Sequence, residues 1–329
     1  MVKKRVLSGI RASGRLHLGN YLGAVKGMLA LQKDPGYETF YMVADLHSIT
    51  TPYNPKNHQK AVREVVLDYL AAGIDPEKST LFIQSHVPEH VELAYLFSTA
   101  VSVARMSHLP TYKEKVKQYP KDITMALLYY PVLMASDILI YKASFVPVGI
   151  DQEPHLEIAR EIARKINSKY GTDFPEPKRF ATKGGYVPSL IGEGKMAKTV
   201  EGSYINLTDD LKIIKERLAS ALTDSGRGKE VPKEGGVANL LKFIELFQGK
   251  RKRKEYENKY TTTGICYKDL KDELAEAIHE ELKPIQKRRT ELEKKPEYIE
   301  EILKDGAVRA GKVASKTLSE VKKAMGLDS

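Results

Sequence analysis

Apolar runs and segments of helical spacing alternate along the first half of the chain. Apolar runs of about four to eight residues between turn signals are typical of buried strands, whereas apolar residues three and four positions apart are typical of amphipathic helices. The segment 130–140 is mostly apolar, so we expect it to be buried. The patterns predict strands at residues 6–10, 40–45, 80–85 and 145–149, and helices at 21–32, 58–72, 91–106 and 153–170.

Alternating strands and helices predict an α/β fold, a doubly wound parallel sheet with helices on both faces. In such sheets ligands bind beyond the carboxyl ends of the strands, so we expect a ligand site along that edge. The polar residues sit at the carboxyl ends of the predicted strands, namely Arg11 and Ser13, Asp45 and His47, Gln84 and Ser85, and the segment 149–152.

The pattern changes after residue 205, where strand signals become rare and helices are predicted at 209–222, 237–247, 267–285 and 302–325. A chain of 329 residues is long enough for two domains, since a single core rarely grows beyond about 250–300 residues. We predict a sheet-containing domain over 1–205, an all-helical domain over 206–300, and a C-terminal helix over about 301–329 that packs back near the first domain.

The chain is basic, with a formal net charge of +10 at pH 7. This balance favours a polyanionic partner such as nucleic acid, although a lysine-rich solubilising surface would produce the same balance. Residues 250–254 form a run of five cations. The run has two interpretations as well, a solvated face or turn and a contact with an RNA backbone.

Composition excludes several classes of protein. The single cysteine rules out an internal disulfide framework and a cysteine-cluster metal site. The apolar run near the N-terminus is too short for a signal peptide. No run of about 18 apolar residues predicts a membrane span. We therefore expect a cytoplasmic protein that does not bind a membrane.

The first motif with chemical potential spans residues 9–20, where a strand leads through a glycine-containing turn into a helix. Backbone N–H groups and the positive end of the helix dipole make such a start a phosphate site. His17 and Asn20 lie three positions apart, and both can donate hydrogen bonds to phosphoryl oxygens. The alternative, which spacing alone favours, is that His17 and Asn20 only cap the helix.

The second motif is a loop with two lysines, Lys195 and Lys198, bracketed by glycines at 192, 194 and 202. Two ammonium groups on a flexible loop can close over a triphosphate and neutralise the charge that develops on the leaving group. A solvent-exposed basic loop is the alternative. The apolar Met196 between the lysines predicts an anchor that holds the loop against the body of the protein.

One carboxylate, Asp137, stands inside the apolar segment 133–140. A buried carboxylate needs a donor partner. That donor is either a nearby cation such as Lys142 or an N–H group of a ligand. Met134 offers a soft wall for an aromatic ring.

The two motifs resemble the HIGH and KMSKS signatures of the class I aminoacyl-tRNA synthetases. With the segments 45–50, 81–85, 112–115, 134–139 and 146–152, the chain resembles the tryptophanyl-tRNA synthetases over nearly its whole length. The resemblance implies a Rossmann-type catalytic domain, a helical anticodon-binding domain and a homodimer. It also implies that the protein activates L-tryptophan with ATP and transfers it to tRNA(Trp), with Mg²⁺ held by the ATP phosphates and no metal site in the protein.

The resemblance also assigns roles to individual residues. The catalytic residues would be His17, Asn20, Lys195 and Lys198. The ATP site would comprise Arg11, Ala12, Ser13, Gly19 and Asn20, then Gly149, Ile150 and Asp151 at the ribose, Val187 at the adenine, and Lys195, Met196, Ala197, Lys198 and Thr199 over the phosphates. The tryptophan site would comprise Met134 and His47, with Asp137 at the indole N–H. Tyr130 and Gln152 would lie at the α-amino group, and Thr111 would lie near the carboxylate.

The chain departs from the family pattern at a few positions. Ala197 and Thr199 replace the two serines of KMSKS, Ala12 stands where proline is usual, and Ile150 replaces an acidic residue. Because the lysines and Asp137 remain, we expect catalysis to survive with altered ATP affinity. Two alternatives stay open, a tyrosine-specific synthetase on the same scaffold and a non-catalytic or auxiliary RNA-binding paralogue.

Overall fold

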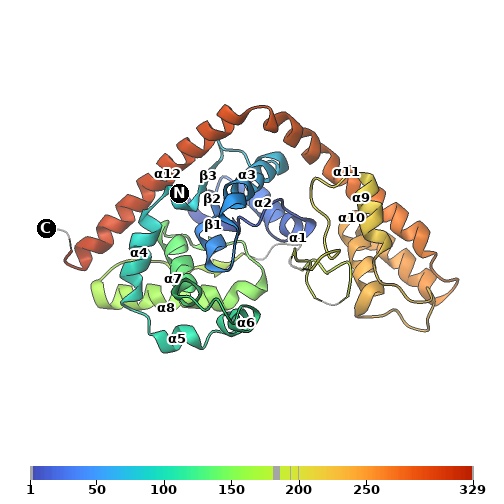
Figure 1. Ribbon diagram of the computed structural model, residues 1–329, viewed down its shortest axis with the longest axis horizontal. Coiled ribbons are helices and arrows are strands. Elements are labelled where there is room, and N and C mark those ends of the chain that lie inside the picture. The colour runs from blue at the N-terminus through green and yellow to red at the C-terminus, as the bar shows by residue number, and fades with distance from the viewer. Residues whose placement is uncertain (1–2, 181–185, 193, 199, 328–329) are drawn as a thin grey trace.

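A computed structural model describes residues 3–180, 186–192, 194–198 and 200–327. The sheet and the helices around it form one part of the molecule, and a group of helices forms the other end (Figure 1). The last two long helices form an arch, in which the C-terminal helix runs over the sheet part and the helix before it runs along the helical end. None of the helices in the described ranges has the length and apolar character that a membrane span requires.

Five parallel strands form one sheet in the order β3-β2-β1-β4-β5, which confirms the predicted α/β class. Parallel pairing aligns the carboxyl ends of the strands, so the residues that follow them meet at one edge. The predicted strand at 145–149 is wrong in length, since β4 covers two residues before Pro147, which cannot donate to a ladder. The strands are β1 (Lys4–Arg11), β2 (Tyr37–Ala44), β3 (Ser79–Ile83), β4 (Phe145–Val146) and β5 (Lys178–Arg179).

Helices cover both faces of the sheet. The predicted helix at 58–72 is α3, which begins after the cap Asn54 and ends at Gly73 with φ +112°. The predicted single helix at 91–106 is wrong, because the structure has two helices and Ser102 caps the second. The helices of this part are α1 (Leu18–Asn20), α2 (Lys26–Lys33), α3 (Pro55–Ala72), α4 (Glu89–Ser98), α5 (Val103–Ser107), α6 (Pro110–Gln118), α7 (Met125–Ile140) and α8 (Glu153–Tyr170). Short helical turns complete them, a π-helix η1 (Tyr21–Val25) and the 3₁₀ turns η2 (Leu46–Thr50), η3 (Gln84–His86) and η4 (Ile150–Gln152).

The second half is helical as predicted, although three of the four helices named below are longer than expected and the one predicted at 209–222 is shorter. Their bounds are α9 (Leu211–Ala219), α10 (Gly235–Thr261), α11 (Tyr267–Glu293) and α12 (Pro296–Ala324). Gly249, with φ +88°, bends α10 just before the five cations. The run 250–254 is therefore helical rather than a turn. Lys252 and Arg253 form ion pairs with glutamates within the helical part, at 3.0 Å to Glu273 and 2.6 Å to Glu245.

Two helices tie the helical end to the sheet. Helix α11 packs against α3, where the buried Arg289 forms ion pairs with Asp68 and Glu64. Asp68 also accepts a hydrogen bond from the backbone N–H of Leu16, one position before His17. Helix α12 packs across β3 and α4, as Figure 1 shows. The part of the first motif just before His17 is thus linked, through Asp68, to the helical end of the molecule.

Candidate active site

The first motif caps a helix and has two hydrogen-bond donor groups that the capping does not use. Gly14 turns the chain after β1 with φ +91°. The Nδ1 atom of His17 accepts from the N–H of Gly19 at 3.0 Å, and Asn20 Oδ1 accepts from the N–H of His17 at 3.2 Å. His17 and Asn20 therefore do cap α1. Because those acceptor atoms are used, the amide NH₂ of Asn20 and the other ring nitrogen of His17 are left as donors.

His17 acts as a neutral hydrogen-bond donor in this setting. Burial, followed by the charges of Lys198 and Lys195, lowers the pKa of His17 to about 4. The ring is thus neutral near pH 7, and its proton lies on Nε2 because Nδ1 accepts. His17 can donate a hydrogen bond to an oxyanion, but it is a poor source of a proton at neutral pH.

The second motif lies directly against the first. Met196 is buried, and its N–H donates to the carbonyl of Val187 at 3.0 Å. A Cβ atom built on Gly19 would lie 3.4 Å from Cβ of Met196. The predicted anchoring of the loop by Met196 is confirmed. Lys198 donates from Nζ to the carbonyl of Ser13 at 3.1 Å, so the two polar clusters meet at one place.

The third part of the site follows β4. Asp151 lies 3.4 Å from Nζ of Lys195, measured from Oδ1, and its Oδ2 accepts from the amide of Gln152 at 2.8 Å. A side chain on Gly149 would overlap the Asp151 carboxylate in its present position, so glycine allows the carboxylate to lie close to the backbone here. Ile150 is 73% exposed. Carboxylate, lysine and glycine together make an edge that could take a ribose and its phosphates.

Four further positions in the predicted ATP site are held by different contacts. The N–H of Ala12 donates to Ser48 Oγ at 2.7 Å, while Arg11 donates to Thr51 at 3.1 Å. The side chain of Val187 is buried in the core, so an adenine ring would have to meet its backbone. The carbonyl of Ala197 accepts from Ser203 Oγ at 2.6 Å. Thr199 lies outside the described residues.

Asp137 is completely buried and holds three hydrogen bonds. Its Oδ2 accepts from His47 at 2.7 Å, and its Oδ1 accepts from His90 at 2.6 Å and Gln84 at 2.8 Å. Burial alone would raise the pKa of Asp137, but the hydrogen bonds of His47 and His90 outweigh it and lower the pKa to about 2. The carboxylate is ionised at neutral pH. Since two oxygens offer about four acceptor sites, one site on Oδ2 is left for a ligand.

Lys142 is not the partner of Asp137, so that alternative is wrong. Lys142 forms ion pairs with Asp173 and with Glu320, the latter at 2.9 Å. Lys142 follows the end of α7, where its side chain faces other elements of the surface. The carboxylate of Asp137 faces the interior, toward the turns that follow β2 and β3.

The other residues predicted for the tryptophan site lie together. The hydroxyl of Tyr130 is 2.9 Å from Thr111 Oγ1, and both contact Nε2 of His155. Nδ1 of His155 lies 3.0 Å from Gln152 Oε1. The rings of His47 and Tyr130 meet edge to face with centroids 6.4 Å apart. Met134 is half-buried on α7, one turn before Asp137.

Sequence reasoning missed two polar residues at this site, His90 and His155, and it placed Gln84 at the sheet edge without the contact to Asp137. Gln84 and His90 bind Asp137, and His90 also reaches the hydroxyl of Tyr141 at 2.7 Å. Oε1 of Gln84 is a buried acceptor with no hydrogen-bond partner among the described residues. The signal for His155 was its place on the apolar face of α8, three positions after Gln152.

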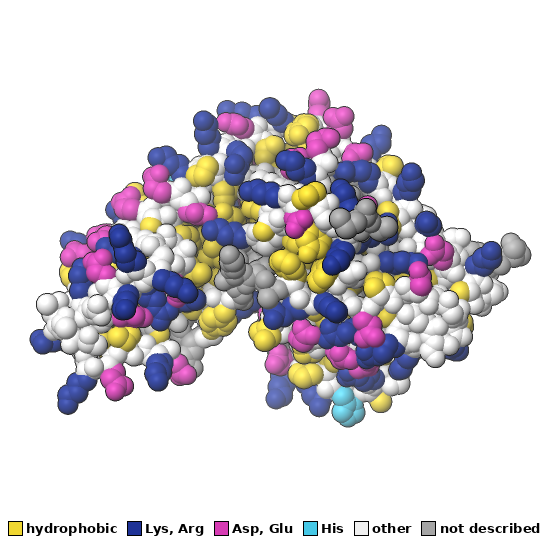
Figure 2. Space-filling model, turned by 180° about the vertical axis from the view of Figure 1, so that it is seen from behind, with side chains coloured by type: hydrophobic (Ala, Val, Ile, Leu, Met, Phe, Trp, Pro, Cys, Tyr) yellow, Lys and Arg dark blue, Asp and Glu magenta, His cyan; other side chains and the backbone are white. Residues whose placement is uncertain are grey.

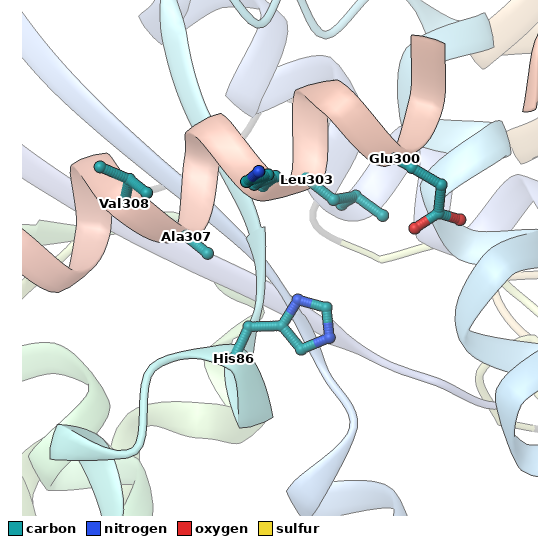
Figure 3. A pocket seen from close by; sticks show the side chains of 6 residues that line it. His86, Glu300, Leu303, Ala307 and Val308 are labelled. Atoms are coloured by element: carbon teal, nitrogen blue, oxygen red, sulfur yellow. The ribbon is translucent and has the colours of Figure 1, made fainter. Parts of the chain in front are cut away.

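Two cavities lie outside these residues. One, of about 390 Å³, has His86 on one side and the helix α12 on the other (Figure 3). The second, of about 490 Å³, lies between α10 and the residues that flank Val187. The described residues contain no group of three or more His, Cys, Asp and Glu side chains that could hold a metal ion.

A family model and sequence relatives match most of the chain and describe the same kind of protein. The family model described as tRNA synthetases class I (W and Y) matches residues 2–283. The tryptophan–tRNA ligase of Porphyromonas gingivalis is 40% identical over 327 residues, covering 98% of this chain and 98% of that protein. The corresponding ligase of Thermotoga maritima is 40% identical over 333 residues, covering 98% and 99%.

Solved structures show the same likeness. The crystal structure of tryptophanyl-tRNA synthetase from Mycoplasma pneumoniae has a TM-score of 0.87 at 32% identity and covers 99% of each chain. The structure of the Campylobacter jejuni synthetase, complexed with ADP and tryptophan, has a TM-score of 0.84 at 33% identity, covering 98% of this chain and all of that one (100%).

Proposed function

Because the chain belongs to the class I tRNA synthetases of the tryptophan and tyrosine type, we propose that it is a tryptophan–tRNA ligase. It activates L-tryptophan with ATP to give tryptophanyl-adenylate and pyrophosphate, and it transfers the acyl group to the terminal ribose of tRNA(Trp). The observation that carries the proposal is the meeting of Gly19, Met196 and Lys198, together with the buried, ionised Asp137. The partner of Asp137, His47, is next in the chain to Ser48, the side chain that binds Ala12.

Adenylation in this site depends on positioning and on charge. The tryptophan carboxylate attacks the α-phosphorus, and pyrophosphate leaves with extra negative charge. His17 Nε2–H and the amide of Asn20 donate to phosphate oxygens, while Lys195 and Lys198 neutralise the leaving group. ATP must displace Lys198 from the Ser13 carbonyl and Lys195 from Asp151, which frees Asp151 to accept from a ribose hydroxyl.

The proposed reaction requires ATP bound along the two motifs and Mg²⁺ bound to the ATP phosphates. ATP would lie along 11–13 and 19–20, with its ribose at 149–151 and its adenine beside the backbone of Val187. Mg²⁺ neutralises phosphate charge when bound. Because the described residues offer no carboxylate cluster, the phosphate oxygens would be its principal ligands.

Recognition of tryptophan rests on the remaining acceptor site of Asp137. An indole N–H that reaches Oδ2 completes the hydrogen bonding of a carboxylate already held by His47, His90 and Gln84. A ligand without a donor there would leave that buried acceptor unpaired. A site built around such a hydrogen bond strongly rejects a ligand that lacks the donor. Tyrosine also has a donor, but the closely similar relatives carry the name of tryptophan.

We place tRNA on the helical domain, 206–300, and expect the enzyme to act in the cytoplasm, where tRNA is charged. We also propose a homodimer. Helices α4, α5 and α7 expose large apolar side chains, among them Tyr95 and Met125, which are 70% and 73% exposed. Because α4 and α5 both pack against α7, we take these exposed apolar side chains as the candidate interface.

Aminoacylation tests the proposal. Transcripts of tRNA(Trp) and tRNA(Tyr) are incubated with the protein, ATP, Mg²⁺ and each amino acid, and charged product is separated on acid gels. We expect charging of tRNA(Trp) with tryptophan alone. Charging of tRNA(Tyr) with tyrosine would support the tyrosine alternative, and the absence of charging in every combination would support a non-catalytic paralogue.

A further inference from the structure

A buried histidine that the mechanism above does not use lies between two residues predicted to bind the ligand. His155, on α8, is 4% exposed. Its Nδ1 lies 3.0 Å from Gln152 Oε1, and its Nε2 lies 2.8 Å from the hydroxyl of Tyr130 and 3.1 Å from Thr111 Oγ1. Every polar atom of the ring therefore contacts the amino-acid pocket.

The direction of each hydrogen bond follows from the chemistry of the partners. Hydrogen bonding by Gln152 and the charge of Lys195 outweigh burial and hold the pKa of Asp151 below its usual value. The ionised carboxylate can only accept, so Nε2 of Gln152 donates to it at 2.8 Å. The carbonyl oxygen of Gln152 then faces His155. Because a carbonyl oxygen only accepts, Nδ1 of His155 carries the proton.

The other ring nitrogen must accept. Burial, followed by the charge of His47, lowers the pKa of His155 to about 4, so the ring is neutral near pH 7. With the proton on Nδ1, Nε2 accepts from Tyr130 or Thr111. These two hydroxyls are 2.9 Å apart, so one donates to Nε2 and the other donates to the first. In both arrangements the hydroxyl proton of Tyr130 points to Thr111 or to His155.

We propose that His155 is a positioning residue that orders the protons of Tyr130 and Gln152, so that both present oxygen lone pairs to the α-ammonium group of tryptophan. This inference rests on the proposed function, since it requires tryptophan as the ligand. Tyr130 keeps a lone pair because its proton is held elsewhere. Gln152 Oε1 keeps its second lone pair. The neutral ring adds no positive charge beside the ammonium group.

Ligand selectivity separates this role from a structural one. Indole-3-propionate has the indole and the carboxylate of tryptophan but no ammonium group. Because the chain contains no tryptophan, the indole fluorescence of either ligand reports binding directly. The His155→Leu variant should bind L-tryptophan about 10- to 100-fold more weakly than the wild-type protein, the usual effect of losing hydrogen bonds to a charged group. Its affinity for indole-3-propionate should be unchanged.

Two further variants keep the test decisive. His155→Asn retains an N–H close to the Nδ1 position and should recover part of the lost affinity for tryptophan. Asp137→Asn, the matched control, acts on the indole and should weaken both ligands alike. Equal losses for both ligands in the His155 variants, or no loss for either, would overturn the inference. Failure of the wild-type protein to bind tryptophan would instead contradict the proposed function.

Discussion

At the scale of single residues, we expect Lys198 to make the proposed reaction sensitive to alkaline pH. Burial lowers the pKa of Lys198 to about 8 in the free protein, so its ammonium group is charged at pH 7 and loses its proton as the pH rises through 8. We expect kcat/KM for ATP, which reports the free enzyme, to fall above about pH 8. Pyrophosphate exchange measured across pH tests this.

Arginine supplies the control, because its guanidinium stays charged throughout this range. If the Lys198→Arg variant keeps measurable activity, its alkaline decline should disappear. A wild-type profile that stays flat to about pH 10, near the ordinary pKa of lysine, would mean that the charge of Lys198 is not needed.

The sequence indicated candidate side chains for the chemistry, but not which groups they contact. An acidic residue in an apolar segment predicts a buried carboxylate, and Asp137 is buried. Its partners His47 and His90 lie 90 and 47 positions away in the chain. Local spacing therefore pointed to Lys142, the nearby cation. Such partners depend on which helices pack together, and one sequence does not contain that information.

At the scale of elements, the contact between α12 and β3 depends on one glycine. A Cβ atom on Gly306 would overlap the carbonyl group of Leu81 in β3. Gly306→Ala should therefore destabilise the protein by about 1–3 kcal/mol, the usual cost of overpacking. The midpoint of urea unfolding measures the change.

Gly311 on the same helix is the matched control. A Cβ atom there would meet nothing within 4 Å, so Gly311→Ala should be neutral or stabilising by about 0.5–1 kcal/mol, because alanine favours helices over glycine. If both variants shifted the midpoint equally, the close passage of α12 over β3 would be refuted.

Apolar runs and glycine stops predicted whole strands and helices, whereas a break between two consecutive helices left little signal in the sequence. The apolar runs of β1, β2 and β3 and the glycine stop of α3 were visible in the sequence. The break between α4 and α5 was not, because residues 99–102 contain neither glycine nor proline. Its only local signal is Ser102, which accepts from the N–H of Arg105. A serine is too common to mark a helix start without other evidence.

At the scale of the whole molecule, the net charge does not by itself locate an RNA surface. Figure 2 shows Lys and Arg spread over one face among Asp and Glu. Within the run 250–254, Lys252 and Arg253 are held in ion pairs. The exposed cations Lys250, Arg251 and Lys254 are left as the candidates for phosphate contacts.

Replacing these three cations by alanine tests that surface. Each phosphate contact contributes about 0.7–0.9 to the slope of log K against log salt concentration. The triple variant should therefore lower the slope for tRNA by about 2–3 and leave pyrophosphate exchange unchanged. An unaltered slope would remove residues 250–254 from the RNA surface.

The proposed homodimer places the apolar face of α4 in contact with a second copy. Tyr95→Asp would bury a charge there and should shift the protein to a monomer in analytical ultracentrifugation. Tyr298→Asp, at an exposed tyrosine near the start of α12, is the control and should leave the mass unchanged. A wild-type monomer, or a Tyr95→Asp dimer, would contradict this interface.

ATP–pyrophosphate exchange with each of the twenty amino acids tests the central claim most directly, that Gly19, Lys198 and Asp137 serve one active site. The account predicts exchange that depends on tryptophan, with a sharply lower rate in Lys198→Ala and a raised KM for tryptophan in Asp137→Asn. Exchange driven best by another amino acid, or unaffected by both substitutions, would contradict it.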